Sequence, residues 1–141
     1  MASQSKAPSP SPGIVSILSP YPFGETVQRL LSAFAAHGLT GFATIDQAAA
    51  AAGVGLTMPP TMLIVFGNPK AGTPLLLAQP LSGIDLPLKV LVAESTPGEI
   101  RVSFNTAMYT AMYIIERHSL PSGLAENLAP AERLIAGAIA K

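Results

Sequence analysis

A continuous apolar run in the middle of the chain most limits the folds it can adopt. Residues 61–66 read Thr-Met-Leu-Ile-Val-Phe, and Pro60 and Gly67 bound them. A run this short, with large apolar side chains at successive positions, is typical of a strand that is buried on both faces. We therefore predict a strand at residues 61–66 whose two faces both lie inside the protein.

Four further strands are predicted around this one. They lie at residues 14–18, 39–45, 86–93 and 99–104. The segment Ser95-Thr-Pro-Gly98 has the composition of a hairpin turn between the last two strands. Pro87 should lie near the start of its strand or at a sheet edge, because proline donates no backbone hydrogen bond. The last strand alternates polar and apolar residues, which predicts one face in solvent.

Helices are predicted in five places. They span residues 25–37, 47–52, 75–79, 105–118 and 130–141. In the first helix, apolar side chains recur at i, i+3, i+4 and i+7 and so share one face. Asp46 is placed to cap the second helix, an alanine run, and Asn105 to cap the fourth. In the fourth helix Met108, Met112 and Ile115 form an apolar stripe that we expect to face the core.

The order of these elements indicates the fold class. Strands and short helices alternate at first, but the later strands follow one another as hairpins rather than as parallel βαβ units. This pattern favours an α+β fold, in which helices pack on one face of a mostly antiparallel sheet. Residues 14–141 are expected to form this single domain, and the Ser/Pro-rich residues 1–13 a flexible tail.

The composition excludes several classes of function. Charged residues make up 11% of the chain, against about 25% in typical domains, and eight basic side chains balance eight acidic ones. Without a basic surface to attract phosphates, nucleic-acid binding is not expected. The absence of cysteine excludes disulfides, thiolate metal sites and a cysteine nucleophile. A domain with so few charges tends to bury an apolar surface against another copy, so we expect a homodimer.

The longest segment without a charged residue lies between Asp46 and Lys70. Its length would reach across a bilayer, but two glycines and the pair Pro59-Pro60 interrupt it. A helix through two prolines would lose backbone hydrogen bonds in lipid. The start of the chain also has no apolar stretch of signal-peptide length. We therefore expect no membrane interaction and a cytoplasmic location.

Four segments of the chain resemble a known family. They are Phe42-Ala-Thr-Ile-Asp46, Phe66-Gly-Asn-Pro-Lys-Ala-Gly-Thr-Pro74, Asp85-Leu-Pro-Leu-Lys-Val-Leu-Val92 and Arg117-His118. Together they resemble the "domain of unknown function 302" family of small bacterial and archaeal proteins, over residues 14–120. The resemblance implies a β-α-β-β-β-β-α fold of the TATA-binding-protein-like type, homodimers, and no established activity. It leaves the helix predicted at residues 130–141 outside the shared part.

Two positions differ from the pattern of that family. Many members have Ile-Asp-His where this chain has Ile45-Asp46-Gln47, and glycine where it has Ser119. The missing imidazole argues against a metal, haem or acid–base role that needs two histidines. No cofactor is therefore predicted, although haem or a metal belongs to one of the alternatives below.

The loop predicted at residues 67–74 is the most site-like segment. It is similar to a phosphate-binding loop, but Lys70 lies inside the loop rather than before the threonine, and Pro69 removes an amide donor. A tight turn between a strand and a helix explains the same glycines and prolines. A weaker anion site, made of Lys70 and helix-start amides near Thr73, is an alternative. Phe66 and Asn68 beside the loop are further candidates for ligand contact.

Charged residues elsewhere offer a second candidate site. One hypothesis is that Asp46 and Lys89 form a buried pair, with Lys70 and Asp85 nearby; if Asp46 faces a pocket, it would act as a base. Two simpler interpretations compete with this one. Asp46 would only cap a helix, and Lys89 would lie on a solvent face, at a sheet edge or in a dimer interface.

The histidines give a weak metal signal. His118 ends a predicted helix, where its cation would suit the helix dipole, and no HxxxH or HxH spacing is present. The methionines of that helix would be soft ligands beside His118 or, more typically, core residues. Tyr109 and Tyr113 lie on another face of the helix and would line a groove or the dimer interface. No serine has the GxSxG context of a hydrolase.

These features leave three functions open. The first is a non-catalytic, dimeric module that binds a small apolar or amphipathic ligand, or a protein partner, in an apolar pocket with a polar rim. The second is an enzyme, or a haem or metal protein, that uses His118 with Asp46, Lys70 or Tyr109. The third is a structural assembly subunit. The candidate ligand-binding residues are Asp46, Phe66, Asn68, Lys70, Thr73, Lys89, Tyr109 and His118, and the expected rim consists of Asp46, Asn68, Lys70 and His118.

Overall fold

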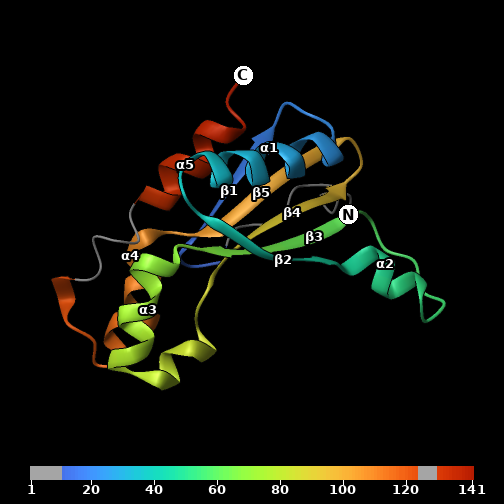
Figure 1. Cartoon of the computed structure of the whole chain (residues 1–141). Coiled ribbons are helices and arrows are strands. Elements are labelled where there is room, and N and C mark those ends of the chain that lie inside the picture. The colour runs from blue at the N-terminus through green and yellow to red at the C-terminus, as the bar shows by residue number, and fades with distance from the viewer. Residues whose placement is uncertain (1–10, 124–129) are drawn as a thin grey trace.

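Five strands form one antiparallel sheet in the structure, a computed structural model that describes residues 11–123 and 130–141 (Figure 1). The strands are β1 (Ile14–Ser19), β2 (Thr40–Asp46), β3 (Thr61–Gly67), β4 (Leu88–Thr96) and β5 (Glu99–Asn105). Their order is β1-β5-β4-β3-β2, and each neighbouring pair is antiparallel. The five predicted strands are confirmed. The tail predicted at residues 1–13 falls almost wholly outside the described residues.

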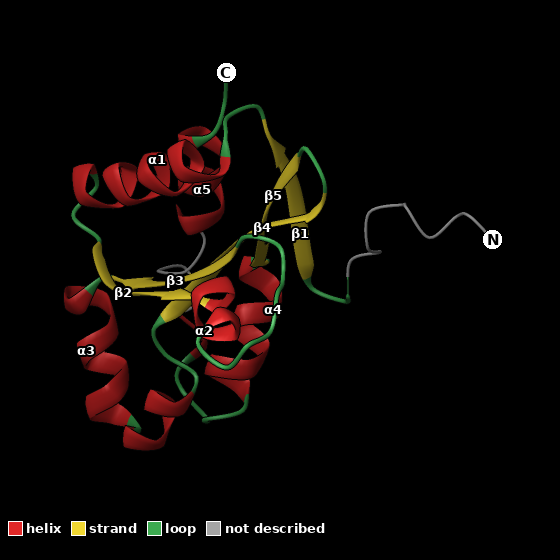
Figure 2. Cartoon of the chain, turned by 90° about the vertical axis from the view of Figure 1, so that its right-hand side faces the viewer, coloured by secondary structure: helices red, strands yellow, loops and turns green. Residues whose placement is uncertain are grey.

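The helices gather at distinct places around this sheet. They are α1 (Phe23–Ala36), α2 (Gln47–Ala52), α3 (Pro69–Ala78), α4 (Ala107–Ala111) and α5 (Pro130–Ala138), with a 3₁₀ turn η2 (Pro80–Ile84) and a π-helical turn η3 (Met112–Glu116). α1 and α5 lie together over one face (Figures 1 and 2), while α2 and the group α3–α4 stand at opposite ends of the strands (Figure 1). The predicted α+β class is confirmed. Among the described helices, none combines the length and the apolar character needed to cross a membrane.

The main core lies between the sheet and the pair α1–α5. Side chains alternate between the two faces of a strand, so every second residue points into this core; in β5 these are Ile100, Val102 and Phe104. Phe34 of α1 stacks on Phe66 of β3, with ring centroids 4.2 Å apart and ring planes 9° apart. The core thus confirms the amphipathic first helix and the alternating last strand that the sequence predicts.

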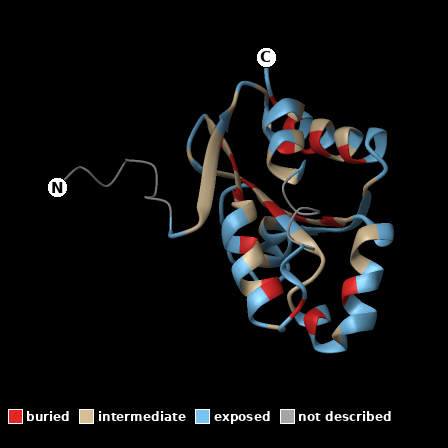
Figure 3. Ribbon diagram, turned by 90° about the vertical axis from the view of Figure 1, so that its left-hand side faces the viewer, coloured by how far each residue is buried: buried red, intermediate tan, exposed pale blue. Residues whose placement is uncertain are grey.

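A second, smaller core forms where α3, η2 and η3 pack together beyond the ends of the strands. Its buried side chains are Leu75, Ile114, Ile115 and Leu120. In Figure 3 the helices of this region carry a few buried positions, in red, among intermediate and exposed ones. In this part of the chain the structure departs most from the prediction.

The prediction of a loop at residues 67–74 is wrong, because α3 begins at Pro69 rather than near Leu75. The Asn68 side chain caps this helix by accepting a hydrogen bond from the Lys70 amide (2.9 Å). Proline at the first helical position already has a helical φ angle, so Pro69 favours this start. Thr73 therefore lies inside α3, and the free amides of a helix start, which the alternative anion site needs, are found near Pro69 instead.

The helix predicted at residues 105–118 is also different. α4 has five residues, is capped by Thr106 rather than Asn105, and continues as the π-helical turn η3. A π turn contains an extra residue, so the buried positions shift along the sequence. Ile115 is buried as expected, but Met108 is 78% exposed and Met112 is 49% exposed. The prediction of an inward methionine stripe is therefore wrong.

The face of the sheet opposite α1 and α5 is uncovered, and we call it the open face. One row across it consists of Ile45, Leu63, Leu91, Ser103 and Ser16. Leu63 in β3 is only half-buried, so the prediction that β3 is buried on both faces is wrong for a single copy of the chain. Of the described helices, none lies over the middle of this face (Figure 1).

Residues 47–60 project from the end of β2, and we call them the arm (Figure 1). Its helix α2 starts as predicted, because Asp46 Oδ1 accepts a hydrogen bond from the Ala49 amide (2.9 Å). α2 has no buried residue, and beyond it Val54 and Leu56 are 74% and 65% exposed. The arm therefore presents apolar side chains that the described part of its own chain leaves uncovered.

Candidate functional site

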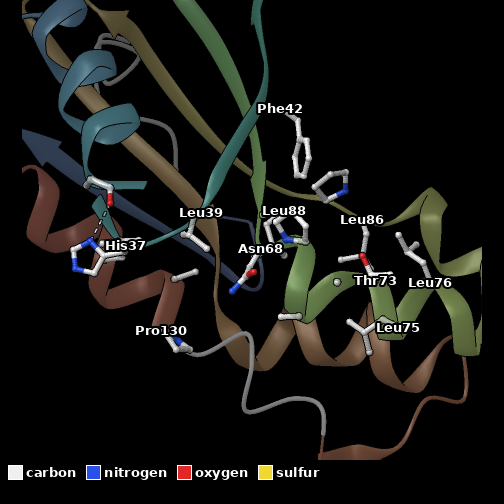
Figure 4. Close-up of a pocket in the computed structure, with 18 of the residues that line it drawn as sticks. His37, Leu39, Phe42, Asn68, Thr73, Leu75, Leu76, Leu86, Leu88 and Pro130 are labelled. Atoms are coloured by element: carbon white, nitrogen blue, oxygen red, sulfur yellow. Dashed lines mark hydrogen bonds between the residues drawn. The ribbon is translucent and has the colours of Figure 1, made fainter. Parts of the chain in front are cut away.

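A large apolar cleft lies between the α1–α5 layer and α3 (Figure 4). Its volume is about 980 Å³, within the range of about 300–1,000 Å³ that is usual for ligand pockets. The end of α1, the start of β2, α3, the segment from η2 to β4 and the start of α5 all contribute walls. The large apolar side chains that line it are Leu39, Phe42, Leu75, Leu76, Leu86, Leu88 and Leu134.

Several of these walls are apolar surface in contact with solvent. Phe42 is 50% exposed and Leu76 is 38% exposed. Gly67 makes room for the Phe42 ring, since a Cβ atom there would come within 3.3 Å of it. Gly72 and Gly137 also line the cleft, and a Cβ atom at either position would meet open space. A ligand with an apolar body would gain free energy by covering these walls.

The rim of the cleft is polar. It carries His37 at the end of α1, Asn68 and Thr73 on the α3 side, and Arg133 on α5. His37 Nδ1 donates to the Ala33 carbonyl at 2.9 Å, so its ring is held at the rim (Figure 4). None of the described residues that line the cleft is Asp or Glu.

The structure brings only part of the predicted site together. Asn68 and Thr73 line the cleft, and of the four expected rim residues Asn68 alone does so. The remaining candidates lie elsewhere: Phe66 in the main core, Asp46 at the start of the arm, Lys70 on α3, Lys89 on β4, Tyr109 on α4 and His118 beside Asp85.

The predicted buried pair of Asp46 and Lys89 is wrong. Lys89 pairs with Val65 and Asp46 with Met62, so β3 lies between them and they are offset along the strands. Lys89 Nζ donates to the Pro87 carbonyl at 3.4 Å, and both charged side chains are exposed. The helix-cap interpretation of Asp46 and the solvent-face interpretation of Lys89 describe the structure better.

Asp85 is the centre of a charged cluster outside the cleft. His118 Nε2 lies 2.6 Å from Asp85 Oδ2, and Arg117 donates to both carboxylate oxygens at 3.1 and 3.0 Å. The His118 and Asp85 side chains are 9% and 15% exposed. This cluster ties the end of η2 to the end of η3 and so closes the second core.

Comparison with known proteins identifies the family. The model of a family described as "Domain of unknown function DUF302" matches residues 15–140. The chain belongs to the DUF302 family. A solved structure, an uncharacterized conserved DUF302 protein from Bacillus stearothermophilus, shares the fold with a TM-score of 0.72 and 18% sequence identity; the match covers 92% of this chain and 97% of that one.

Curated relatives of this DUF302 chain carry another name. Proteins named "Fluoride-specific ion channel FluC 1" from Brucella suis and Brucella abortus are each 35% identical to it over 117 residues, which is 83% of this chain. The same segment makes up 44% and 41% of those proteins. The chain therefore spans less than half the length of these relatives.

The DUF302 match corrects one expectation and explains another. It extends to residue 140, so α5 belongs to the shared part of the family, contrary to the resemblance that ended at residue 120. Ser119, which stands where many members have glycine, has a φ of 54°. This left-handed backbone favours glycine, because it brings a Cβ atom close to the following carbonyl.

Two of the segments that carry the DUF302 resemblance meet in the Asp85 cluster. Replacing Asp85 by alanine would leave the half-buried His118 without its acceptor. We expect the free energy of unfolding to fall by about 1–3 kcal/mol. Urea unfolding followed by circular dichroism measures this change, and Glu116→Ala, which removes an exposed carboxylate from η3, is the control. A loss no larger than that of the control would contradict the structural role of the cluster.

The particular convergence predicted for an enzyme or metal protein, His118 with Asp46, Lys70 or Tyr109, is not found in the described part of the chain. His118 makes its side-chain hydrogen bond to Asp85, and not to Asp46, Lys70 or Tyr109. Within residues 11–123 and 130–141, no three His, Asp or Glu side chains are close enough to hold a metal ion.

Sequence reasoning missed most of the cleft. His37, Phe42 and Arg133 line it, but they come from α1, β2 and α5, which are far apart in the sequence. No motif links them. The local features that could have drawn attention are the small residues Gly137 and Ala138, which leave room beside α5.

Proposed function

We propose that this DUF302 protein is a non-catalytic module that binds a small apolar or amphipathic ligand in the cleft. The proposal is supported by one observation above all: a space of about 980 Å³ with leucine-rich walls and a rim of a few polar side chains. Ligand pockets commonly combine apolar walls with a small number of polar groups that orient the ligand. The name of the Brucella relatives is not transferred, because the similarity spans less than half of them.

A variant that fills the cleft tests the proposal. Gly72 lies on α3, lines the cleft and has open space at its Cβ position, so leucine there would occupy the ligand volume. We expect the wild type to bind the neutral apolar dye Nile red with enhanced fluorescence. Gly72→Leu should weaken this binding about tenfold, since overfilled apolar sites cost about 1–3 kcal/mol.

Gly24→Leu is the matched control for this experiment. Gly24 is also helical with open space at its Cβ position, but it lies in the first turn of α1 and does not line the cleft. Dye binding equal to the wild type is expected, because the cleft is unchanged. If the two leucine variants bind Nile red equally well, or the wild type does not bind it, the cleft is not the ligand site.

We also propose that the protein assembles as a homodimer through the arm and the open face. A six-residue helix with no buried side chain is too short to be stable alone, because even alanine-rich helices need about 12–15 residues. The arm lacks charged residues, and the neighbouring open face carries three apolar side chains in a row, Ile45, Leu63 and Leu91. A two-fold interface uses the same patch on both copies, so each arm would cover the partner's open face.

A further inference from the structure

The charge around the cleft has one sign. The guanidinium-bearing Arg133 lines it, whereas no described lining residue is acidic. The nearest acidic residue in sequence, Glu132, lines a separate small cavity with Phe104 and Tyr113. A ligand that enters the cleft therefore meets a cationic group without a competing carboxylate among the described lining residues.

Arg133 and His37 lie at the same end of the cleft. The Tyr21 hydroxyl, just before α1, donates to the carbonyl of Ala140, just after α5, at 3.2 Å. The two packed helices are thus antiparallel, which places the start of α5 beside the end of α1. Figure 4 shows His37 and Pro130 together at this end, and Leu75, Leu76 and Leu86 at the other. The site is therefore polar and cationic at one end and apolar at the other.

We infer that the ligand is a monoanionic amphiphile, an alkyl chain with a carboxylate head, and that Arg133 binds the carboxylate. This inference rests on the proposed function and names the class of ligand. The planar guanidinium matches a carboxylate with two parallel hydrogen bonds. The chain of the ligand lies along the aliphatic walls, where leucines outnumber aromatic rings.

Competition against bound Nile red tests the head group. Decanoate, 1-decanol and decylamine share one chain and differ in charge, and each is used below its micelle-forming concentration. We expect the wild type to prefer decanoate over 1-decanol about fivefold, because an exposed ion pair contributes up to about 1 kcal/mol. Decylamine should compete least well. Arg133→Gln should abolish the preference for decanoate and leave 1-decanol unchanged, while Arg133→Lys should keep part of it.

Arg29→Gln is the control, because Arg29 stacks on Tyr21 near the start of α1 and does not line the cleft. It should retain the full preference for decanoate, and high salt should reduce that preference in the wild type. Equal binding of decanoate and 1-decanol by the wild type, or a preference that survives Arg133→Gln, overturns the carboxylate inference alone. Failure of Nile red itself to bind would instead remove the proposed function.

Discussion

Replacing Phe66 by alanine is expected to lower the free energy of unfolding by about 3–5 kcal/mol. Phe66 is 1% exposed and stacks on Phe34, so it joins the sheet to α1 at the centre of the main core. Alanine would lose the burial of the ring and leave a cavity that the packed strands cannot fill by local movement. Urea denaturation followed by far-ultraviolet circular dichroism measures the change.

Phe42→Ala is the matched control, because it makes the same chemical change in the neighbouring strand. The Phe42 ring is 50% exposed at the edge of the cleft, so its loss should cost less than about 1 kcal/mol in the absence of ligand. In the Nile red assay the order should be the opposite: Phe42→Ala should weaken dye binding more than Phe66→Ala, because Phe42 lines the cleft and Phe66 does not. A Phe66 variant as stable as the Phe42 variant would contradict the position of Phe66 in the core.

Much of the fold follows from the sequence because it depends on neighbouring residues. The alternation in β5, the single apolar face of α1 and the carboxylate cap at Asp46 all have local causes, and all three appear in the structure. The start of α3 is also local, but two signals compete there. Pro69 and Pro74 are both suited to a first helical position, and the Asn68 cap decides in favour of the first.

The rest could not be predicted because it depends on how distant segments pack. The π turn η3 shifts which residues of its helix are buried, so that Met112 is exposed while Ile115 stays buried, and the spacing of Met108 and Met112 does not predict this turn. The cleft likewise exists only after α1, β2, α3 and α5 have met. Polar residues on a rim such as His37 and Arg133 are ordinary surface residues in the sequence, and only their shared cleft distinguishes them.

A pair of glutamates in the arm is expected to convert the proposed homodimer into a monomer. Val54→Glu with Leu56→Glu places two charges where the arm would meet the partner's open face. Burying an unpaired charge is strongly unfavourable, and the apolar burial of both side chains would also be lost. We expect the dimer to weaken by more than about 100-fold. Native mass spectrometry at micromolar concentration measures the change as the disappearance of the dimer.

The control for the arm is a second pair of exposed leucines. Leu77 and Leu81, at the tip of α3 and η2, are 79% and 76% exposed, against 74% and 65% for Val54 and Leu56. Leu77→Glu with Leu81→Glu should leave the dimer intact. Neither double variant should change the melting temperature of the monomer, since all four side chains are in solvent in a single copy. If only the control pair breaks the dimer, the interface lies at the tip of α3 instead. If the wild type is a monomer, the proposed homodimer is wrong. Because folding is unaffected in either case, the mass alone decides whether the arm belongs to the interface between two copies.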